Sequence, residues 1–492
     1  MPVTLLNGAR ATTLLLAAGL ALSGCVTSAG LEPSGKPVDP ASLKAGQTLD
    51  GTPLSSAAWP TQKWWSALGD PQLDSLIGEA LQGSPDLQIA AARARQASAA
   101  AQVEDAARMP SVDGKASYSG IRLPKSVASE PLGGRYVSIK SLSLGFNYDI
   151  DLWGGQRAAW EAALGRANAA EVDRQAAAVD LSTNIARAYS ELAHAYIAHD
   201  LAKDELERSQ RLLDLSQKRM DAGLDSKVQL QQNQAQVSSA RQQVTAAEER
   251  IDGDRIALAV LLGQGPDRGQ AIQRPRGLQP GVLALPSNLP AELLGRRPDI
   301  VAARWRVEAA SKDIKAAKTR FYPNLNLGAM LGLATLHTTD LLEAPSRFYQ
   351  LAPALSLPLF DGGRRRADLA GSDADYDLAV AQYNKALIGA LGEVSDDLGR
   401  LRSLQQQLVD QRDARDIARS NFELAMRRYG EGVGNYLDAL SVQQQLLLAE
   451  RQLANLEAQR IDLSIQLIQA LGGGFQTDAG SAPAALAQTD AQ

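Results

Sequence analysis

Few side chains of this chain have the types and the spacing that catalysis or metal binding requires. His194 and His199 are five residues apart, so on a helix they would not share one face, and they make a poor metal pair. Gly472-Gly473-Gly474 lacks the Lys and the Ser or Thr of a phosphate-binding loop and is better explained as a helix stop. The acidic pair Asp396-Asp397 is expected to be solvated on an exposed helix surface. The sequence therefore predicts no enzyme, no cofactor and no metal site.

Cys25, the one cysteine, has the surroundings of a lipidation site. Residues 1–24 have a weakly basic start and a short apolar stretch, which is the pattern of a secretory signal peptide rather than of a membrane helix. The segment ends in Leu22-Ser23-Gly24-Cys25, which resembles the bacterial lipobox. We expect an S-diacylglycerol on Cys25 and an N-acyl chain such as palmitate, because one chain alone anchors a protein weakly. Val26 follows in place of Asp, which favours the outer membrane by analogy with enteric lipoproteins.

Composition predicts long helices and excludes a nucleic-acid partner. Phe, Trp and Tyr make up 5% of the 492 residues, which favours helices with small contact residues over a large aromatic core. The formal net charge is −5 and no block of Lys or Arg stands out, so nucleic acid is not expected to bind. Residues 25–58 are rich in Pro, Gly, Ser and Ala and are expected to form an extended, lipid-anchored linker. Residues 476–492 are expected to be a disordered tail.

One ordered set of landmarks occurs twice, about 210 residues apart. The first set is Ser84-Pro85-Asp86, Met109-Pro110, Asp151-Leu152-Trp153-Gly154-Gly155, Asp221-Ala222-Gly223 and Leu261-Leu262-Gly263. The second set is Arg297-Pro298-Asp299, Tyr322-Pro323, Phe360-Asp361-Gly362-Gly363, Gly430-Glu431-Gly432 and Leu471-Gly472. We therefore expect two structural repeats, over residues 59–289 and 290–475, related by an internal pseudo-symmetry.

Each repeat is expected to contain a β-hairpin, over residues 111–151 and 323–360. Apolar residues alternate there with polar or small ones, most clearly between Leu142 and Ile150. Each strand has about ten residues, the length of a tilted membrane-spanning strand, and aromatic residues gather near the strand ends. A soluble half-buried sheet would show the same alternation, although the lipobox argues against it. Because four strands cannot close a barrel and an open edge in lipid is costly, several subunits must share their strands.

Each repeat is also expected to contain an antiparallel helical hairpin, over residues 154–262 and 363–471. The first long helix would have some 65 residues, or about 100 Å. Apolar residues at every seventh position, with small residues between them, predict a coiled-coil seam that partner helices can approach closely. In this helix the seam positions are Ile185, Leu192, His199, Leu206, Leu213 and Met220, and the intervening positions are Ala188, Ala195, Ala202, Ser209 and Ser216.

Taken in order, these motifs resemble those of the TolC family of outer-membrane efflux proteins, in the lipoprotein branch similar to OprM and NodT. The resemblance covers about residues 59–475, and its motifs are weak singly but specific together. They are Trp64-Trp65, Gly69-Asp70-Pro71-Gln72-Leu73-Asp74, Ser84-Pro85-Asp86-Leu87, Tyr148-Asp149-Ile150-Asp151-Leu152-Trp153-Gly154, Arg296-Arg297-Pro298-Asp299-Ile300, Phe321-Tyr322-Pro323, Leu359-Phe360-Asp361-Gly362-Gly363, Asn435-Tyr436-Leu437 and Leu471-Gly472-Gly473-Gly474-Phe475.

The resemblance implies a mainly α-helical fold with a membrane β part. In a homotrimer, four strands from each subunit would form one shared 12-stranded transmembrane β-barrel, continuous with a periplasmic α-barrel of helical hairpins. The protein would be anchored in the bacterial outer membrane and would extend into the periplasm. Its partners would be a periplasmic adaptor and an inner-membrane transporter of the resistance-nodulation-division (RND) type.

The function implied by the resemblance is that of a passive exit duct in a tripartite efflux pump. Such a duct conducts drugs and other toxic small molecules and contributes to multidrug resistance. The same fold could instead serve metal-ion efflux or type I protein secretion. The lipobox and the ending Leu471-Gly472-Gly473-Gly474-Phe475 favour small-molecule or metal pumps over protein secretion. A lipid-anchored coiled-coil tether would lack the alternating strands.

The resemblance also implies an aperture at the helix tips that opens when the adaptor docks. Leu437 is the candidate for a hydrophobic ring and Asp438 for an acidic ring. Ser441 stands where relatives usually carry an acidic residue, and Gln444 stands where they often carry arginine. Alternatively, Leu437 packs inside its hairpin and Asp438 is a solvated carboxylate at a helix start. The candidates for adaptor contact, which turn chemistry alone could also explain, are Gly223, Leu224, Asp225, Gly432 and Val433.

Overall fold

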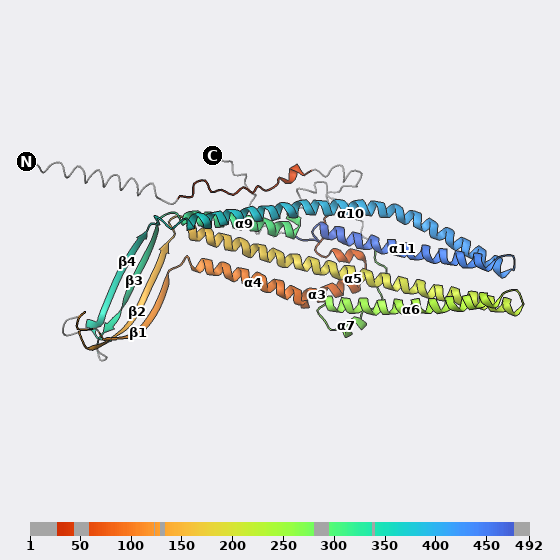
Figure 1. Cartoon of the computed structure of the whole chain (residues 1–492), viewed down its shortest axis with the longest axis horizontal. Helices are drawn as coiled ribbons and strands as arrows, with labels where there is room; N and C mark the ends of the chain where they lie inside the picture. The colour runs from red at the N-terminus through yellow and green to blue at the C-terminus, as the bar shows by residue number, and fades with distance from the viewer. Residues whose placement is uncertain are drawn as a thin grey trace, which may run out of the picture.

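The computed structural model describes residues 27–43, 59–122, 124–127, 133–279, 295–336 and 340–476. Within these ranges the chain is elongated, with a sheet at one end and helices that run from it to two hairpin tips at the other end (Figure 1). The predicted signal peptide 1–24, the lipidation site Cys25 and the tail beyond residue 476 lie outside the described residues. The predicted linker 25–58 is described over residues 27–43 only.

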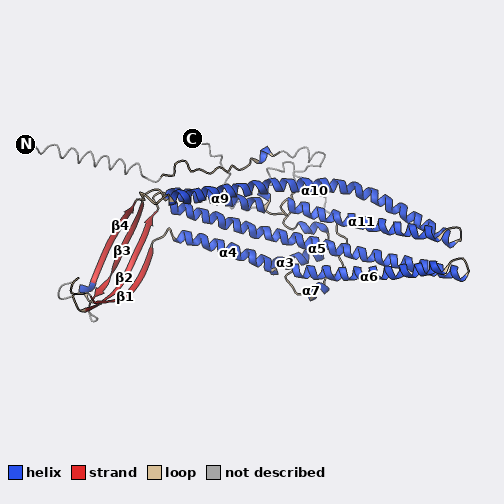
Figure 2. Cartoon of the chain, viewed as in Figure 1, coloured by secondary structure: helices blue, strands red, loops and turns tan. Residues whose placement is uncertain are grey.

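Two long helices run the length of the helical part. α5 (Gly155–Asp221) and α10 (Arg364–Gly430) have 67 residues each, or about 100 Å at the usual helical rise. Each turns back at its tip into a helix of 35 residues, α6 (Lys227–Leu261) or α11 (Tyr436–Ala470). The two hairpins lie side by side, because α11 packs against α5 as well as against α10 (Figure 2).

Shorter helices pack beside the two long helices. α4 (Pro85–Ala106) packs against α5, and α9 (Pro298–Thr319) packs against both α5 and α10; each has 22 residues. α3 (Pro71–Gly83) precedes α4, and Pro85 at the first helical position of α4 separates the two. The remaining short elements are α7 (Asp267–Gln270) and the 3-10 helices η1 (Pro40–Ser42), η2 (Trp64–Leu68) and η3 (Ala344–Ser346).

The sheet consists of four antiparallel strands in sequence order. They are β1 (Ser111–Arg122), β2 (Tyr136–Ile150), β3 (Asn324–Thr335) and β4 (Arg347–Ser356). β2 and β3 are each paired on both sides, whereas β1 and β4 form the two edges. The strands therefore lie where the sequence alternates with period two, and the two hairpins join through β2 and β3.

A glycine and an aspartate shape each passage from strand to long helix. Gly154 and Gly363, which precede α5 and α10, have φ values of 72° and 90°, a conformation that favours glycine. Asp151 accepts a hydrogen bond from the backbone N–H of Arg157 at 2.9 Å, and Asp361 accepts one from that of Arg365 at 3.2 Å. These bonds satisfy amides that the helix start leaves unpaired, which explains why the Asp and Gly motif occurs twice.

Close backbone packing fixes the end of the described chain. Gly472, Gly473 and Gly474 all have positive φ, and a Cβ on Gly474 would lie 2.0 Å from the carbonyl oxygen of Thr61. The next residue, Phe475, is buried against Val172 and two residues of α9. The three glycines thus end α11, and they also let the chain pass against residues near the beginning of the described body.

The seam of α5 differs from the prediction in its tip half. Ile185 and Leu192 are fully buried, but Leu206, Leu213 and Met220 are only half-buried. In that half the buried positions are those expected to lie between the apolar ones, among them Ala202, Ser209 and Ser216. A straight helix drifts relative to a seven-residue repeat, so over 67 residues the buried face moves away from the predicted positions.

Candidate functional site

The register of the sheet sorts its side chains into two faces. Residues directly opposite one another in antiparallel strands point to the same side, so the pairing assigns each residue to a face. The apolar face carries Val112, Gly114, Ala116, Leu142, Leu144, Phe146, Tyr148, Ile150, Leu325, Leu327, Ala329, Leu331, Leu333, Tyr349, Leu351, Pro353 and Leu355. The polar face carries Ser111, Asp113, Lys115, Ser117, Ser119, Ser141, Ser143, Gly145, Asn147, Asp149, Asn324, Asn326, Gly328, Met330, Gly332, Ala334, Gln350, Ala352, Ala354 and Ser356, and Phe348 is its one aromatic residue within the strands. At the far end of β1 and β2 this face also carries three apolar residues, Ile121, Val137 and Ile139.

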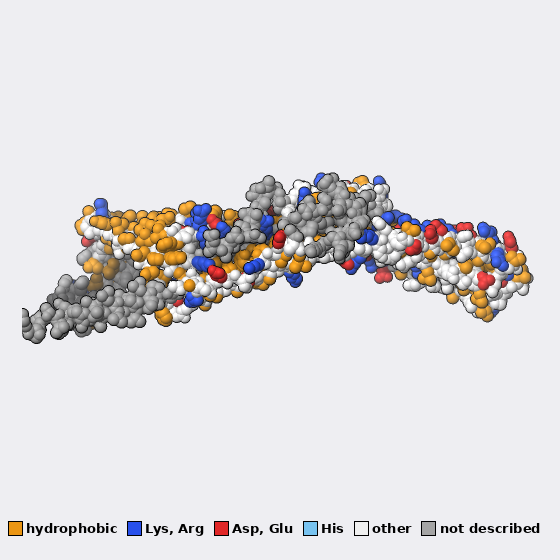
Figure 3. Space-filling view, turned by 90° about the horizontal axis from the view of Figure 1, so that it is seen from above, with side chains coloured by type: hydrophobic (Ala, Val, Ile, Leu, Met, Phe, Trp, Pro, Cys, Tyr) orange, Lys and Arg blue, Asp and Glu red, His pale blue; other side chains and the backbone are white. Residues whose placement is uncertain are grey.

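The residues of the apolar face are either exposed or half-buried, and none of them is fully buried. Leu351 is 78% exposed, Leu355 is 70% exposed and Leu331 is 59% exposed. In Figure 3 the strand end of the molecule is dominated by hydrophobic side chains, whereas charged side chains are mixed over the helices. Exposing so large a contiguous apolar surface to water is unfavourable, so this face is suited to contact with an apolar medium.

The polar face has its own hydrogen bonds across the strands. The side-chain amide of Asn326 donates to Asn147 Oδ1 at 2.9 Å and to Asp149 Oδ1 at 2.7 Å. The hydroxyl groups of Ser117 and Ser141 lie 2.7 Å apart. This face is therefore built for contact with water while its opposite face is built for contact with lipid.

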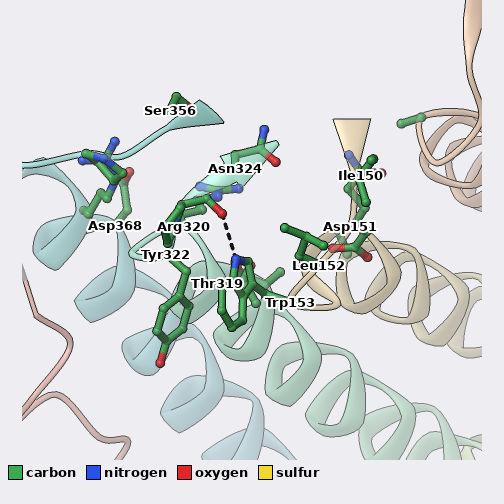
Figure 4. A pocket seen from close by; sticks show the side chains of 18 of the residues that line it. Ile150, Asp151, Leu152, Trp153, Thr319, Arg320, Tyr322, Asn324, Ser356 and Asp368 are labelled. Carbon is green, nitrogen blue, oxygen red and sulfur yellow. Dashed lines mark hydrogen bonds between the residues drawn. The ribbon is translucent and has the colours of Figure 1, made fainter. Parts of the chain in front are cut away.

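A cavity of about 600 Å³ lies where the strands meet the helices (Figure 4). The indole N–H of Trp153 donates to the carbonyl of Pro323 at 2.8 Å, and its ring stacks on Tyr322 at 4.9 Å. Asp361 pairs with Arg365 at 2.7 Å beside the cavity. Because Asp151 and Asp361 bond to the amides at the starts of α5 and α10, the residues around the cavity join the sheet to the helices.

The two hairpin tips are joined to each other by a buried polar cluster. Asp225, in the turn between α5 and α6, pairs with Arg219 at 3.1 Å and accepts a hydrogen bond from the hydroxyl of Tyr429 in α10. Arg219 also donates to the carbonyl of Tyr429 at 2.9 Å, and its guanidinium lies 4.4 Å from the centre of the Tyr429 ring. Burial, followed by the bond to Asp225, raises the pKa of Tyr429 to about 12.

Asp225 was expected to be an exposed turn residue, but its side chain is buried. Its carboxylate is 3% exposed, so the expectation of an exposed contact there is wrong, and its role is to hold Arg219 and Tyr429. Leu224 and Val433 are 65% and 69% exposed, as expected. Gly223 and Gly432 are exposed and have φ values of 74° and 81°, so turn geometry is sufficient to explain these glycines.

The aperture candidates form one stripe along the start of α11. Leu437, Ser441 and Gln444 are spaced four and three residues apart, so they share a helix face, and all three are exposed. Leu437 is 61% exposed, so the alternative that it packs inside its own hairpin is wrong. Asp438 is exposed beside the stripe in the first turn of α11, where a carboxylate is favoured, and its carbonyl accepts a hydrogen bond from Ser441.

A second buried ionic cluster lies farther from the tips and was not predicted. Arg208 of α5 pairs with Glu205 at 3.1 Å and with Glu450 of α11 at 2.9 Å. Glu450 also pairs with Arg419 of α10 at 3.1 Å, and Gln443 donates to Glu205 at 2.7 Å. The cluster joins the first hairpin to the second. Its signal in the sequence is the oppositely charged pair Glu205 and Arg208, three residues apart on the side of α5 that carries the coiled-coil seam.

Asp397 is buried rather than solvated, contrary to expectation. Its residue is 7% exposed, and burial raises the pKa of its carboxyl to about 6, with the neighbouring carboxylates of Asp396 and Glu393 adding to the effect. Asp396 is 59% exposed, as the sequence predicts, and its carboxylate pairs with Arg400 at 3.0 Å. The two neighbours differ because adjacent helix positions point in directions about 100° apart.

His194 and His199 contact different residues. The ring of His194 lies 3.0 Å from the side-chain oxygen of Asn455, and His199 lies near Asp200 and Glu248. Within the described ranges, no group of three or more His, Cys, Asp and Glu side chains could hold a metal ion. No helix in the described part of the chain has both the length and the hydrophobicity that a bilayer crossing requires.

The N-terminal segment, residues 27–43 of the predicted extended linker, lies along α10. The Asp377 carboxylate accepts hydrogen bonds from the Ser34 hydroxyl and the Gly35 N–H, both at 2.6 Å, and these bonds lower the pKa of its carboxyl. Asn384 accepts from the N–H of Val38 at 2.8 Å. Arg366 donates to the carbonyl of Thr27 at 2.5 Å, which brings the start of the segment to the first turn of α10.

Comparison with known proteins identifies the relatives of this architecture. The family described as outer membrane efflux protein matches residues 76–264 and 289–473. The chain is 38% identical to the fusaric acid resistance protein FusA of Burkholderia cepacia over 364 residues, which cover 73% of this chain and 68% of that protein. It is 33% identical to the multidrug resistance outer membrane protein MdtP of Escherichia coli strain K12 over 440 residues, which cover 87% of this chain and 89% of that protein.

A solved structure has the same fold. The outer membrane protein VceC of Vibrio cholerae superimposes with a TM-score of 0.80 at 36% identity. The superposition covers 85% of this chain and 100% of that chain. The long paired helices and the four-stranded sheet are therefore shared with an outer membrane protein whose chain is matched from end to end.

Proposed function

The chain belongs to the outer membrane efflux protein family and is an efflux channel protein of the bacterial outer membrane, and from this premise we propose that three copies form one passive exit duct. The duct receives drugs and other toxic small molecules from a periplasmic adaptor and an inner-membrane RND transporter. FusA and MdtP are named for resistance to fusaric acid and to multiple drugs, which favours small organic molecules over metal ions or secreted proteins as its cargo. We assign no reaction and no cofactor to the chain.

The observation that carries this proposal is the two-faced sheet with its open edges. The apolar face suits lipid and the polar face suits a water-filled channel, but β1 and β4 each have a partner strand on one side only. Unpaired backbone groups in lipid cost several kcal/mol each, so β1 of one copy pairs with β4 of the next. Three copies supply the 12 strands of the barrel that the family resemblance implies.

The helical part offers matching edges for the same ring. α4 and α6 pack against α5, and α10 packs against α9 and α11. The outer sides of α4 and α6, and the part of α10 that residues 27–43 do not cover, are left for neighbouring copies. Exposed apolar residues on α10 are Leu378, Ile388, Val409, Ile417 and Leu424. Those on α4 and α6 are Ile89, Val103, Val228, Ile256 and Val260. Two unlike apolar edges favour a head-to-tail contact, which closes into a ring when the rotation per copy allows it.

We infer that each subunit contains two structural repeats, one in each half of the chain. Corresponding helices in the two halves have equal lengths of 22, 67 and 35 residues, and β1 and β3 have 12 residues each. The family match likewise falls into two segments. The boundaries 59–289 and 290–475 remain our proposal for the two units.

The resting aperture is proposed to lie at the tips. Leu437, Ser441 and Gln444 would face the axis of the ring, with Asp438 beside them, and the bond between Tyr429 and Asp225 would hold the two hairpins together until the adaptor docks. Gly223, Leu224, Gly432 and Val433 would form the adaptor contact. Because this contact lies next to Asp225, docking could separate the hairpins directly.

Lipidation of Cys25 completes the proposal. Thr27 is held at the first turn of α10, close to the sheet, and Cys25 precedes it by two residues. Two residues span at most about 7 Å, so the lipid chains would enter the bilayer at the foot of the barrel.

One experiment on the purified protein tests the duct. We expect detergent-solubilised particles to have the mass of three chains, and we expect them to form stable pores in planar bilayers. Particles with the mass of one chain, or three-chain particles without conductance, would overturn the proposal.

A further inference from the structure

The charged residues of the four strands divide unequally between the two faces of the sheet. The register places Arg122, Lys140 and Arg347 on the side of the apolar face, and no acidic residue of β1 to β4 lies there. The other three charged residues of the strands, Asp113, Lys115 and Asp149, all lie on the polar face. Among the residues of the four strands, this side of the sheet therefore combines an apolar surface with basic residues and no acidic one.

The three basic residues lie where the apolar ladder ends. The ladder follows β2 from Ile150 to Leu142, and Lys140 is the next residue on the same side. Arg347 is opposite Leu333, which in turn is opposite Leu142, so Arg347 stands at the last level of the ladder. Arg122 is opposite Tyr136, four residues beyond Lys140. All three lie toward the end of the strands that points away from the helices (Figure 1).

The length of the ladder places these residues at the surface of a bilayer. Nine residues from Leu142 to Ile150 extend about 30 Å along a strand and about 21–25 Å along the membrane normal at the usual tilt of a barrel strand. That is close to the height of the apolar band of an outer-membrane barrel, so Lys140 lies at the level of the lipid headgroups. Long basic side chains reach outward from such positions.

Tyrosines accompany the basic residues at this level. Tyr118 is directly opposite Lys140, and its hydroxyl lies 3.2 Å from that of Tyr136. Amphipathic rings are favoured at a membrane interface. Beyond the strands, the described loop residues include both signs: Lys125 and Arg135 follow β1, while Asp340 and Glu343 precede β4.

We propose that Arg122, Lys140 and Arg347 form a binding band for the phosphate groups of the anionic glycolipid in the outer leaflet. This inference rests on the proposed duct, which places the far end of the strands in that leaflet. Guanidinium groups bind phosphate oxygens in pairs of parallel hydrogen bonds, and the ammonium of Lys140 adds a point charge. The band would hold lipid against the barrel wall, while the polar face remains in contact with water.

The test measures binding of fluorescent lipopolysaccharide to the purified full-length protein in detergent. The variants are Lys140→Gln, Arg347→Gln and a triple variant that combines both with Arg122→Gln. We expect the affinity for lipopolysaccharide to fall about fivefold for each charge removed, which corresponds to about 1 kcal/mol per residue. Dephosphorylated lipopolysaccharide should bind the native protein weakly. Arg347→Lys keeps the charge and should retain most of the binding, which separates loss of charge from loss of fold.

Lys115→Gln is the matched control, because Lys115 belongs to the same strand as Arg122 but lies on the polar face. Its affinity should stay within twofold of the native value. Equal losses in Lys115→Gln and Lys140→Gln, or equal binding of phosphorylated and dephosphorylated lipid, would overturn the band. Conductance measured on the same preparations separates the two proposals. If the triple variant forms pores like the native protein and binds lipid equally well, the lipid-binding band is wrong and the duct is not. If the native protein forms no pore, the duct is wrong.

Discussion

The hydroxyl of Tyr429 in α10 donates a hydrogen bond to the carboxylate of Asp225, which lies 204 residues earlier in the chain, in the turn of the other hairpin. Arg219 completes the cluster from the last turn of α5. Both side chains of the bond are almost fully buried within one subunit. The tips of the two hairpins therefore cannot separate without exposing or unpairing a carboxylate.

Removing the Tyr429 hydroxyl should weaken the closed state. A hydrogen bond to a charged group contributes about 1.5–3 kcal/mol, so Tyr429→Phe should raise the open fraction of pores by about tenfold or more. Single-channel recording in planar bilayers measures this fraction. Tyr383→Phe, which removes a hydroxyl from the same helix far from the tips, should leave it unchanged. An unaltered open fraction in Tyr429→Phe would remove the bond from the gating mechanism.

The exposed stripe on α11 gives a second prediction about the aperture. If Leu437 narrows the resting pore, Leu437→Ala should raise the resting conductance by removing bulk near the axis. Asp438→Asn should lower the preference for cations over anions, because three carboxylates would lose their charge. Leu448→Ala is the control, since Leu448 continues the same stripe but lies three turns farther from the tip and is 67% exposed. Native conductance and selectivity in both variants would dismiss the aperture assignment.

The buried ionic cluster predicts a large loss of stability from a single substitution. Arg208→Met leaves the carboxylates of Glu205 and Glu450 buried without their shared partner, which should cost about 3–5 kcal/mol. Arg211→Met removes an exposed arginine three residues later, whose nearest carboxylate is 3.7 Å away, and should cost less than about 1 kcal/mol. Urea unfolding followed by circular dichroism compares the two. Similar midpoints would show that the cluster contributes little.

The raised pKa of Asp397 predicts a pH-dependent stability. The folded protein binds the proton more tightly than the unfolded chain, so this group favours folding fully below the unfolded pKa of about 4 and loses that contribution as the pH rises to about 6. Asp397→Asn should therefore raise the stability at pH 7.5 by up to about 3 kcal/mol and change it little at pH 4. Asp396→Asn changes the exposed neighbouring residue, so it should change the stability much less at either pH. Thermal midpoints at both pH values decide the matter, and equal shifts at both would contradict the assignment.

The docking of the N-terminal segment is tested by amide exchange. Asp377→Ala removes the acceptor for Ser34 and Gly35, so the amides of residues 34–38 should exchange several-fold faster. Gly35→Ala should act in the same direction, because a Cβ there would lie 2.9 Å from Asp377 Oδ1. Asp375→Ala, at an exposed position two residues away, is the control. Unchanged protection in both test variants would show that other contacts hold the segment.

Local patterns were sufficient to predict the strands and the turns. The alternation from Leu142 to Ile150 depends only on a period of two, and each Asp and Gly pair caps the helix that follows it within a few residues. These features are properties of short segments, so the sequence contains them in full.

Partners from distant segments could not be predicted in the same way. Asp225 was expected to be an exposed turn residue because its bond to Tyr429 crosses from one hairpin to the other. Asp397 and Asp396 are adjacent and chemically identical, and only the packing of neighbouring helices makes one buried and the other exposed. The docking of residues 27–43 depends on Asp377 and Asn384, some 345 residues away, so composition alone predicted an extended linker without these contacts.

The close passage of Gly474 against Thr61 sets an order of assembly for each subunit. Residues near the start of the described body make their final contacts with residues that are synthesised after the whole of α11. A polypeptide released before Phe475 would leave the groove around Val172 and α9 unfilled, however complete its strands and long helices were. The packing around Val172 and α9 is therefore completed only after both helical hairpins have been synthesised and Phe475 has reached its place.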